Sequence, residues 1–66
     1  MKLQVDQESD ALHLRLDDSK IIESEEVSPG IIIDFNEKKE VVGIEILHLS
    51  RRSPTLNLKE LQFQVA

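Results

Sequence analysis

Carboxylates give this chain its clearest capacity for chemistry. The sequence holds 13 Asp and Glu residues among 66, and paired carboxylates supply acid and base groups to enzymes or oxygen ligands to cations. An exposed acidic surface that keeps edge strands from pairing with other molecules is the competing interpretation, and we favour it. A metal-dependent or acid–base enzyme that uses the acidic cluster is the less favoured alternative. The candidate cation ligands are Glu25, Asp34 and Glu45.

Two histidines, His13 and His48, are the other candidates for proton transfer or metal binding, because imidazole titrates near neutral pH. Neither belongs to an HExxH-type ligand pair, and no serine stands in a GxSxG nucleophile motif. We therefore expect ordinary surface or cross-strand roles for both histidines. No catalytic residue and no cofactor is assigned from the sequence.

The basic pair Arg51 and Arg52 could contact an anion or a nucleic acid, because guanidinium groups suit phosphate. Two arginines supply little of the affinity that phosphate binding needs, and the formal net charge of −5 opposes a nucleic-acid binder. Neither Gly30 nor Gly43 stands in a glycine-rich phosphate loop. We expect local salt bridges for the arginines and no nucleic-acid partner.

The length of the chain predicts one small domain over residues 1–66. A domain of this size buries only about 60% of the surface that its unfolded chain exposes, so its stability is marginal. Cysteine is absent, which excludes disulfides and thiolate zinc ligands as added support. Association with another chain is the remaining support, and a homodimer is the first expectation.

No apolar run approaches the length of a membrane span, and the N-terminus lacks the apolar segment of a signal peptide. The only aromatic residues are Phe35 and Phe63, too few for a platform on which bases stack. We therefore expect a soluble cytoplasmic protein with no membrane partner.

The apolar residues recur with period two, which predicts strands rather than helices. In the segment ALHLRL, for example, Leu12, Leu14 and Leu16 share one face. The expected strands cover residues 3–5, 12–16, 20–27, 31–35 and 41–49.

The C-terminal part of the chain is open to two interpretations. Residues 49–53 fit a turn or a single helical turn that Pro54 would stop. Residues 55–66 fit a strand or a short helix, and we favour a strand that begins near Leu58.

Residues 30–49 form the clearest element, a hairpin of two β-branched apolar runs around a charged turn. In the turn before it, Pro29 sets φ at the first central position and Gly30 tolerates a positive φ at the second. Gly43 costs stability within a strand unless it forms a bulge or lets another backbone approach closely. The second face of this hairpin is too apolar for a fully solvated surface. The predicted interface residues are Ile32, Leu47, Leu49 and, from the C-terminal segment, Phe63.

These patterns predict a mostly β fold. We expect a single small antiparallel β-meander or sheet of five to six strands, with at most one or two short helical turns. The domain is expected to act as a homodimer or to bind a protein partner encoded nearby.

Four segments of the chain resemble a known family. They are D-x-E-x-D-A-L-x-L-R-L at residues 6–16, E-S-E-E-V at 23–27, P-G-I-I-I-D-F at 29–35 and V-V-G-I-E-I-L at 41–47. Together they are similar to the small prokaryotic family catalogued as domain of unknown function 2283. That family commonly has proline and alanine in place of Gln7 and Ser9, and an aromatic residue in place of His13.

The resemblance implies a compact β-rich domain and transfers no catalytic residue to this chain. Some members of the family look like partners of small toxin-like proteins, which implies an antitoxin-like role as the alternative function. An acidic protein of this kind could cover a small basic toxin by charge complementarity. Our first functional expectation is a non-catalytic binding or assembly module that self-associates.

Overall fold

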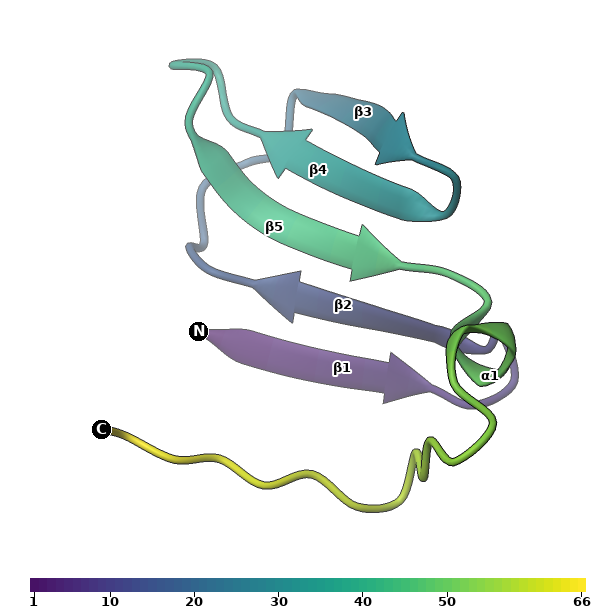
Figure 1. Cartoon of the computed structure of the whole chain (residues 1–66). Helices are drawn as coiled ribbons and strands as arrows, with labels where there is room; N and C mark the ends of the chain where they lie inside the picture. Colours follow the sequence, from purple (N-terminus) through teal and green to yellow (C-terminus); the bar gives the residue numbers. More distant parts are fainter.

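Five β-strands and one short helix form the regular part of the chain. The computed structural model describes all residues from 1 to 66. The strands form one antiparallel sheet (Figure 1), so the mostly β architecture expected from the sequence is confirmed. The elements are β1 (Lys2–Asp6), β2 (Ala11–Arg15), β3 (Glu23–Ser28), β4 (Ile31–Phe35), β5 (Val41–Ile46) and α1 (Leu49–Arg52).

The order of the strands in the sheet is β1-β2-β5-β4-β3. Strands β3, β4 and β5 follow one another as a meander, but β2 pairs with β5 and not with β3. The link between β2 and β3, residues 16–22, therefore leads from the middle of the sheet to its far edge (Figure 1). As a result, β5 is the central strand, with β2 on one side and β4 on the other.

The register divides the sheet into an apolar face and a polar face. On β5, Ile44 is opposite both Leu14 of β2 and Ile33 of β4. Directly opposed residues share a face, and side chains alternate along each strand. The intervening residues therefore make up the polar face. The apolar face is defined by Leu12, Leu14, Ile31, Ile33, Ile44 and Ile46.

The turn between β3 and β4 takes the conformation that the sequence predicts, and the turn after β1 is closed by a side chain. Gly30 has a φ of 77° in the tight turn between β3 and β4, the positive value that glycine tolerates without strain. After β1, the carboxylate of Asp6 accepts hydrogen bonds from the backbone N–H of Ser9, at 3.2 Å, and from its hydroxyl, at 2.9 Å. Both turns thus follow from local side-chain chemistry.

Helix α1 is held at one end of the sheet by Asp10 in the β1–β2 turn. The backbone carbonyl of Asp10 accepts the N–H of Leu49 at 3.0 Å, and its carboxylate accepts the N–H of Ser50 at 3.0 Å and its hydroxyl at 2.6 Å. His48, which precedes the helix, provides no side-chain cap. Asp10 therefore supplies, from a distant part of the chain, the acceptors that the first N–H groups of a helix lack. With four residues, α1 is far too short to span a membrane.

The final part of the hairpin differs from the expectation. The strand predicted to reach residue 49 ends at Ile46, and His48 adopts a left-handed conformation with a φ of 55°. This reversal turns the chain into α1, where Leu49 is buried.

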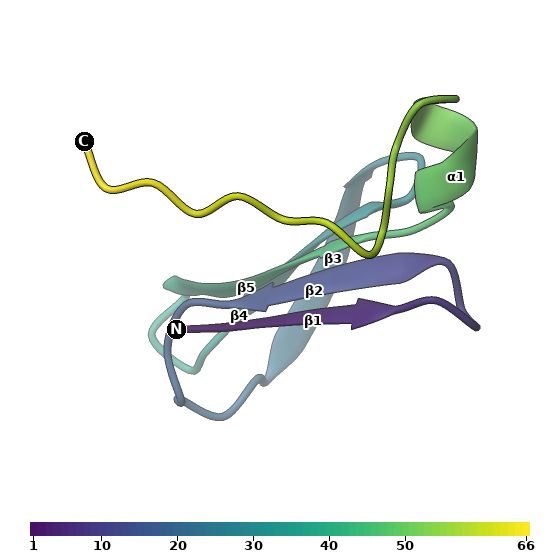
Figure 2. The ribbon, with the colours of Figure 1, turned by 90° about the horizontal axis from the view of Figure 1, so that it is seen from below.

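The chain after α1 forms no strand, so the expectation of a strand from Leu58 is wrong. Residues 53–66, named here the tail, make two turn hydrogen bonds of their own and none to the backbone of the sheet. An alternating sequence forms a strand only where a neighbouring strand takes up its backbone hydrogen bonds, and none does here. The tail runs past β1 without joining it, on the same side of the sheet as α1 (Figures 1 and 2).

Candidate functional site

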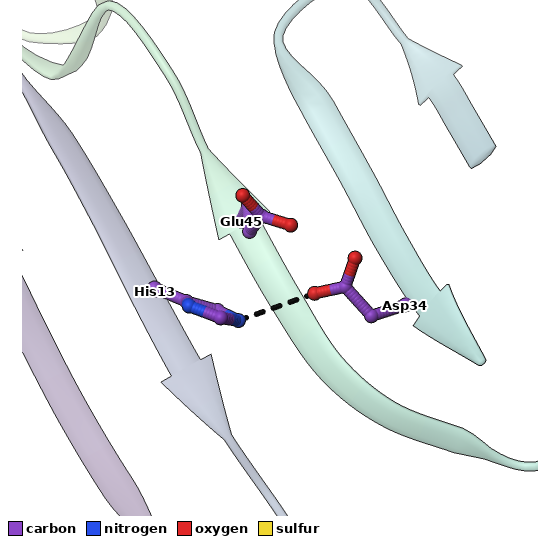
Figure 3. Close-up of side chains that lie close together, drawn as sticks. All are labelled: His13, Asp34 and Glu45. Atoms are coloured by element: carbon purple, nitrogen blue, oxygen red, sulfur yellow. Dashed lines mark hydrogen bonds and ion pairs between the residues drawn. The ribbon is translucent and has the colours of Figure 1, made fainter. Parts of the chain in front are cut away.

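Three side chains that can bear chemistry meet on the polar face. His13 of β2, Asp34 of β4 and Glu45 of β5 place their ligand atoms within 4.8 Å of one another. Nε2 of His13 lies 3.1 Å from Oδ2 of Asp34. Figure 3 shows these two groups reaching toward each other across β5, with Glu45 beside them. We name this group the His13–Asp34–Glu45 cluster.

The strand order explains why these side chains meet. His13 is directly opposite Glu45 in the β2–β5 pair, and Asp34 is directly opposite Gly43 in the β4–β5 pair. Strands β2 and β4 are not neighbours, so the contact between His13 and Asp34 has to pass over β5. The cluster faces away from α1 and the tail, which lie on the side of the apolar face.

Gly43 provides the space for this contact. A Cβ at this position would lie 2.8 Å from Oδ2 of Asp34 and 3.2 Å from Nε2 of His13. A larger residue would therefore displace one of the two groups. The sequence predicts either a bulge or a close approach at Gly43. The register of β4 against β5 shifts beside it, and the groups that approach it are side chains.

Asp34 is the most deeply buried polar residue, with 0% of its surface exposed. Burial of a carboxylate is costly unless the oxygens have hydrogen-bond donors. The hydroxyl of Ser24 donates to Oδ1 of Asp34 at 2.6 Å, and His13 lies against Oδ2. No buried side-chain nitrogen or oxygen lacks a hydrogen-bond partner. Both carboxylate oxygens of Asp34 are therefore satisfied.

The two carboxylates of the cluster differ in their affinity for protons. Burial opposes the ionisation of Asp34, but hydrogen bonds with Ser24, Glu45 and His13 outweigh it and lower the pKa of Asp34. Burial raises the pKa of Glu45, and the neighbouring Asp34 carboxylate raises it further. Two like charges at this distance cannot ionise independently. Asp34 therefore carries the negative charge first, and Glu45 retains a proton to higher pH.

An open hollow of about 700 Å³ lies beside the cluster on the polar face. His13 and Glu45 line it together with Gln4, Asp6 and Leu47 from neighbouring segments. The hollow gives water and small solutes access to two of the three members of the cluster.

Two of the three predicted cation ligands come together. Asp34 and Glu45 belong to the cluster, whereas Glu25 is opposite Ile33 and so lies on the other side of the sheet. The third member is His13, for which the sequence predicts only a surface or cross-strand role. Gly43 is the one sequence signal for a close contact at this place. It does not indicate which side chains make that contact.

The predicted interface residues do not form one patch. Ile32 is half-buried on the polar face, opposite Glu45, and Leu47 lines the hollow. Leu49 packs inside the chain, because β5 ends before it and α1 begins there. Phe63 is 78% exposed in the tail.

Arg52 of α1 serves the fold. Nε of Arg52 donates to the carbonyl of Leu47 at 2.9 Å, and its Nη2 donates to the carbonyl of Pro29 at 2.7 Å. Arg52 thus joins α1 to the β3–β4 turn, in place of the salt bridge expected for it. His48 is exposed and does not approach the cluster.

Comparison with protein-family models gives one match. The model described as "Protein of unknown function (DUF2283)" matches residues 2–50. This range contains all five strands and the whole His13–Asp34–Glu45 cluster. The chain belongs to this family. Comparison with curated proteins and with solved structures gives no match. This match confirms the family predicted from the sequence. Because the family has no assigned function, the activity has to be inferred from the residues themselves.

Proposed function

We propose that this protein is a non-catalytic binding or assembly module that forms a homodimer through its apolar face and its tail. The main support is the amount of exposed surface. The chain exposes 5458 Å², whereas a folded monomer of 7.6 kDa is expected to expose about 4,300 Å². The excess of roughly 1,200 Å² is larger than the ~800 Å² that each partner contributes to an interface of standard size.

Few of the apolar side chains are covered. Val42 and Leu49 are the only buried apolar side chains in the chain, and the residues of the apolar face are half-buried. Covering one Leu or Ile fully contributes ~1.5–3 kcal/mol relative to leaving it in water. A second layer over the apolar face would therefore add substantially to the free energy of unfolding.

The tail is the segment best suited to supply that layer. Leu61, Phe63 and Val65 alternate along it and are 67%, 78% and 83% exposed. The tail lies on the same side of the sheet as α1 (Figure 2) and opposite the cluster (Figure 3), and the register places the apolar face on this side. In a two-fold dimer, the tail of each copy would cover the apolar face of the other, a self-complementary contact.

Light scattering on size-exclusion eluates tests this proposal. We expect a dimer for the natural chain and a monomer for the variant Leu61→Ser, Phe63→Ser, Val65→Ser. The matched control, Gln62→Ser with Gln64→Ser, changes the intervening positions and should remain dimeric. A dimer that survives in the triple variant would reject the tail as the covering segment. A monomer for the natural chain would reject self-association. If the apolar side chains of the tail were shielded from solvent in that monomer, the tail would cover its own sheet.

An antitoxin-like role is the second candidate, and strand β3 supports it. All six residues of this edge strand are exposed, and three of them are glutamates: Glu23, Glu25 and Glu26. With a net charge of −5, such an edge suits a basic partner that is attracted by charge complementarity. Cytoplasmic location remains a prediction that goes with either role.

Mixing the protein with the product of the neighbouring gene tests the antitoxin-like role. We expect a complex at low salt that weakens as salt is raised, and weakens again when the three glutamates of β3 become glutamines. Absence of a complex at low salt would reject this role.

A further inference from the structure

We propose that the His13–Asp34–Glu45 cluster binds one divalent transition-metal cation, with Zn²⁺ as the reference ion. The ligand set would be one imidazole nitrogen and two carboxylate oxygens. Zn²⁺ and the neighbouring transition metals accept this mixture, whereas Ca²⁺ and Mg²⁺ favour sites made of oxygen alone. This site is separate from the proposed dimer contact, which uses the opposite face of the sheet.

The distances fit a common metal ion. Bonds from Zn²⁺ to nitrogen and oxygen ligands are ~2.0–2.2 Å, so two ligands at a tetrahedral angle lie roughly 3.3–3.6 Å apart. Nε2 of His13 and Oδ2 of Asp34 are 3.1 Å apart, and the ligand atom of Glu45 is within 4.8 Å of both. The half-buried Glu45 side chain has to rotate toward the other two ligands to complete the set.

A hydrogen bond fixes the orientation of the Asp34 carboxylate, as outer hydrogen bonds do for metal ligands. The Ser24 hydroxyl holds Oδ1 at 2.6 Å, which leaves Oδ2 directed at the other members of the cluster. Hydrogen-bonded outer groups of this kind fix the direction and basicity of a ligand. Below the ligand atoms, Gly43 leaves a space that a Cβ would fill. A buried, pre-oriented carboxylate that packs closely over a glycine distinguishes this group from an ordinary acidic surface.

The hollow on the polar face gives the cluster access to solvent. His13 and Glu45 line it, so an ion can enter from this side and keep water in its remaining coordination position. Three protein ligands with one open position is the arrangement of accessible zinc sites.

A purely structural ion pair is the competing explanation. It accounts for His13 and Asp34, which lie in contact, but it leaves Glu45 beside the Asp34 carboxylate, where burial and that neighbour raise the pKa of Glu45. A bound cation neutralises both carboxylates at once. The two explanations differ in one measurable respect, because only the metal site gains affinity from all three side chains.

Isothermal titration of the full chain with ZnCl₂ tests the site. We expect one Zn²⁺ per chain, and a loss of affinity of at least about tenfold in each of His13→Gln, Asp34→Asn and Glu45→Gln. Ser24→Ala should weaken binding less. His48→Gln removes the other histidine, Glu25→Gln removes the candidate ligand on the opposite face, and both should bind like the natural chain.

Two measurements guard against variants that fail to fold. Circular dichroism checks each variant, and Glu45→Gln, at a half-exposed position, is expected to fold normally. In the natural chain, NMR should show Zn²⁺ shifting the ring nitrogen signals of His13 and not those of His48. Equal affinity in the natural chain and Glu45→Gln, or ring signals of His13 that do not respond to Zn²⁺, would overturn the proposal in favour of a structural ion pair.

Discussion

Gly43 is the residue on which the geometry of the cluster depends most directly. Alanine in place of glycine within a strand usually stabilises a protein by roughly 0.5–1 kcal/mol. Here the added Cβ would lie 2.8 Å from Oδ2 of Asp34, and the carboxylate would have to move away from His13. We predict that Gly43→Ala lowers the free energy of unfolding by ~1–3 kcal/mol, the cost of leaving a buried polar group without its partner.

Urea unfolding followed by circular dichroism measures this change. The same substitution in a His13→Gln background should cost less, because part of the contact is already lost. An alanine variant as stable as the natural chain would show that Gly43 is not required for the contact.

Asp10 is the residue whose protonation matters most for α1. Its hydrogen bonds with the hydroxyl and N–H of Ser50 lower the pKa of Asp10 below the ordinary value of 3.8, against the opposing effect of burial. A lowered pKa in the folded state means that the stabilisation is complete above the unfolded pKa and is lost as pH falls through the folded pKa. We therefore predict that Asp10→Asn lowers the thermal midpoint at pH 7, and that its difference from the natural chain shrinks below about pH 4.

Thermal unfolding at a series of pH values checks this prediction. Asp18→Asn, at an exposed position in the next loop, controls for the loss of one negative charge. A difference between Asp10→Asn and the natural chain that is unchanged from pH 7 to pH 3 would contradict the role assigned to the carboxylate.

At the level of the elements, the strands and turns follow from local sequence, but their order does not. Alternating apolar residues around a charged turn are sufficient to predict the hairpin of β4 and β5, and Pro29 with Gly30 predicts the turn between β3 and β4. The pairing of β2 with β5 depends on where the link of residues 16–22 leads the chain, and no local pattern specifies that. In a simple meander, His13 would lie beside β3 and far from Glu45. The cluster therefore cannot be predicted until the strand order is known.

The same reasoning explains the error in the tail. The alternation of Leu61, Phe63 and Val65 resembles that of the true strands, but a strand also needs a partner with free N–H and C=O groups in register. Only a structure shows whether the chain itself provides that partner.

The β3–β4 turn offers a test at the level of one element. Gly30 has a positive φ, and the guanidinium of Arg52 lies where its Cβ would be. We predict that Gly30→Ala lowers the free energy of unfolding by at least ~1–2 kcal/mol, the cost of a left-handed conformation in a residue with a side chain. Urea unfolding measures the effect, and Ser28→Ala, an exposed neighbour, is the control. Equal stability of the two variants would contradict the importance of the positive φ.

For the whole molecule, the balance of buried and exposed surface is the central observation. A single sheet with two buried apolar side chains cannot gain much from the hydrophobic effect alone, and no disulfide is present to compensate. The two sides of the sheet have different roles in our account. We propose that the apolar face and the tail bind a second copy, whereas the polar face holds the cluster.

Sedimentation equilibrium of the natural chain over micromolar concentrations tests the central claim most directly. Self-association predicts a mass of twice 7.6 kDa, with dissociation to monomers only on dilution. Higher salt should strengthen the dimer, because each copy carries a net charge of −5 and like charges are screened. A single species of 7.6 kDa at every concentration would contradict the account.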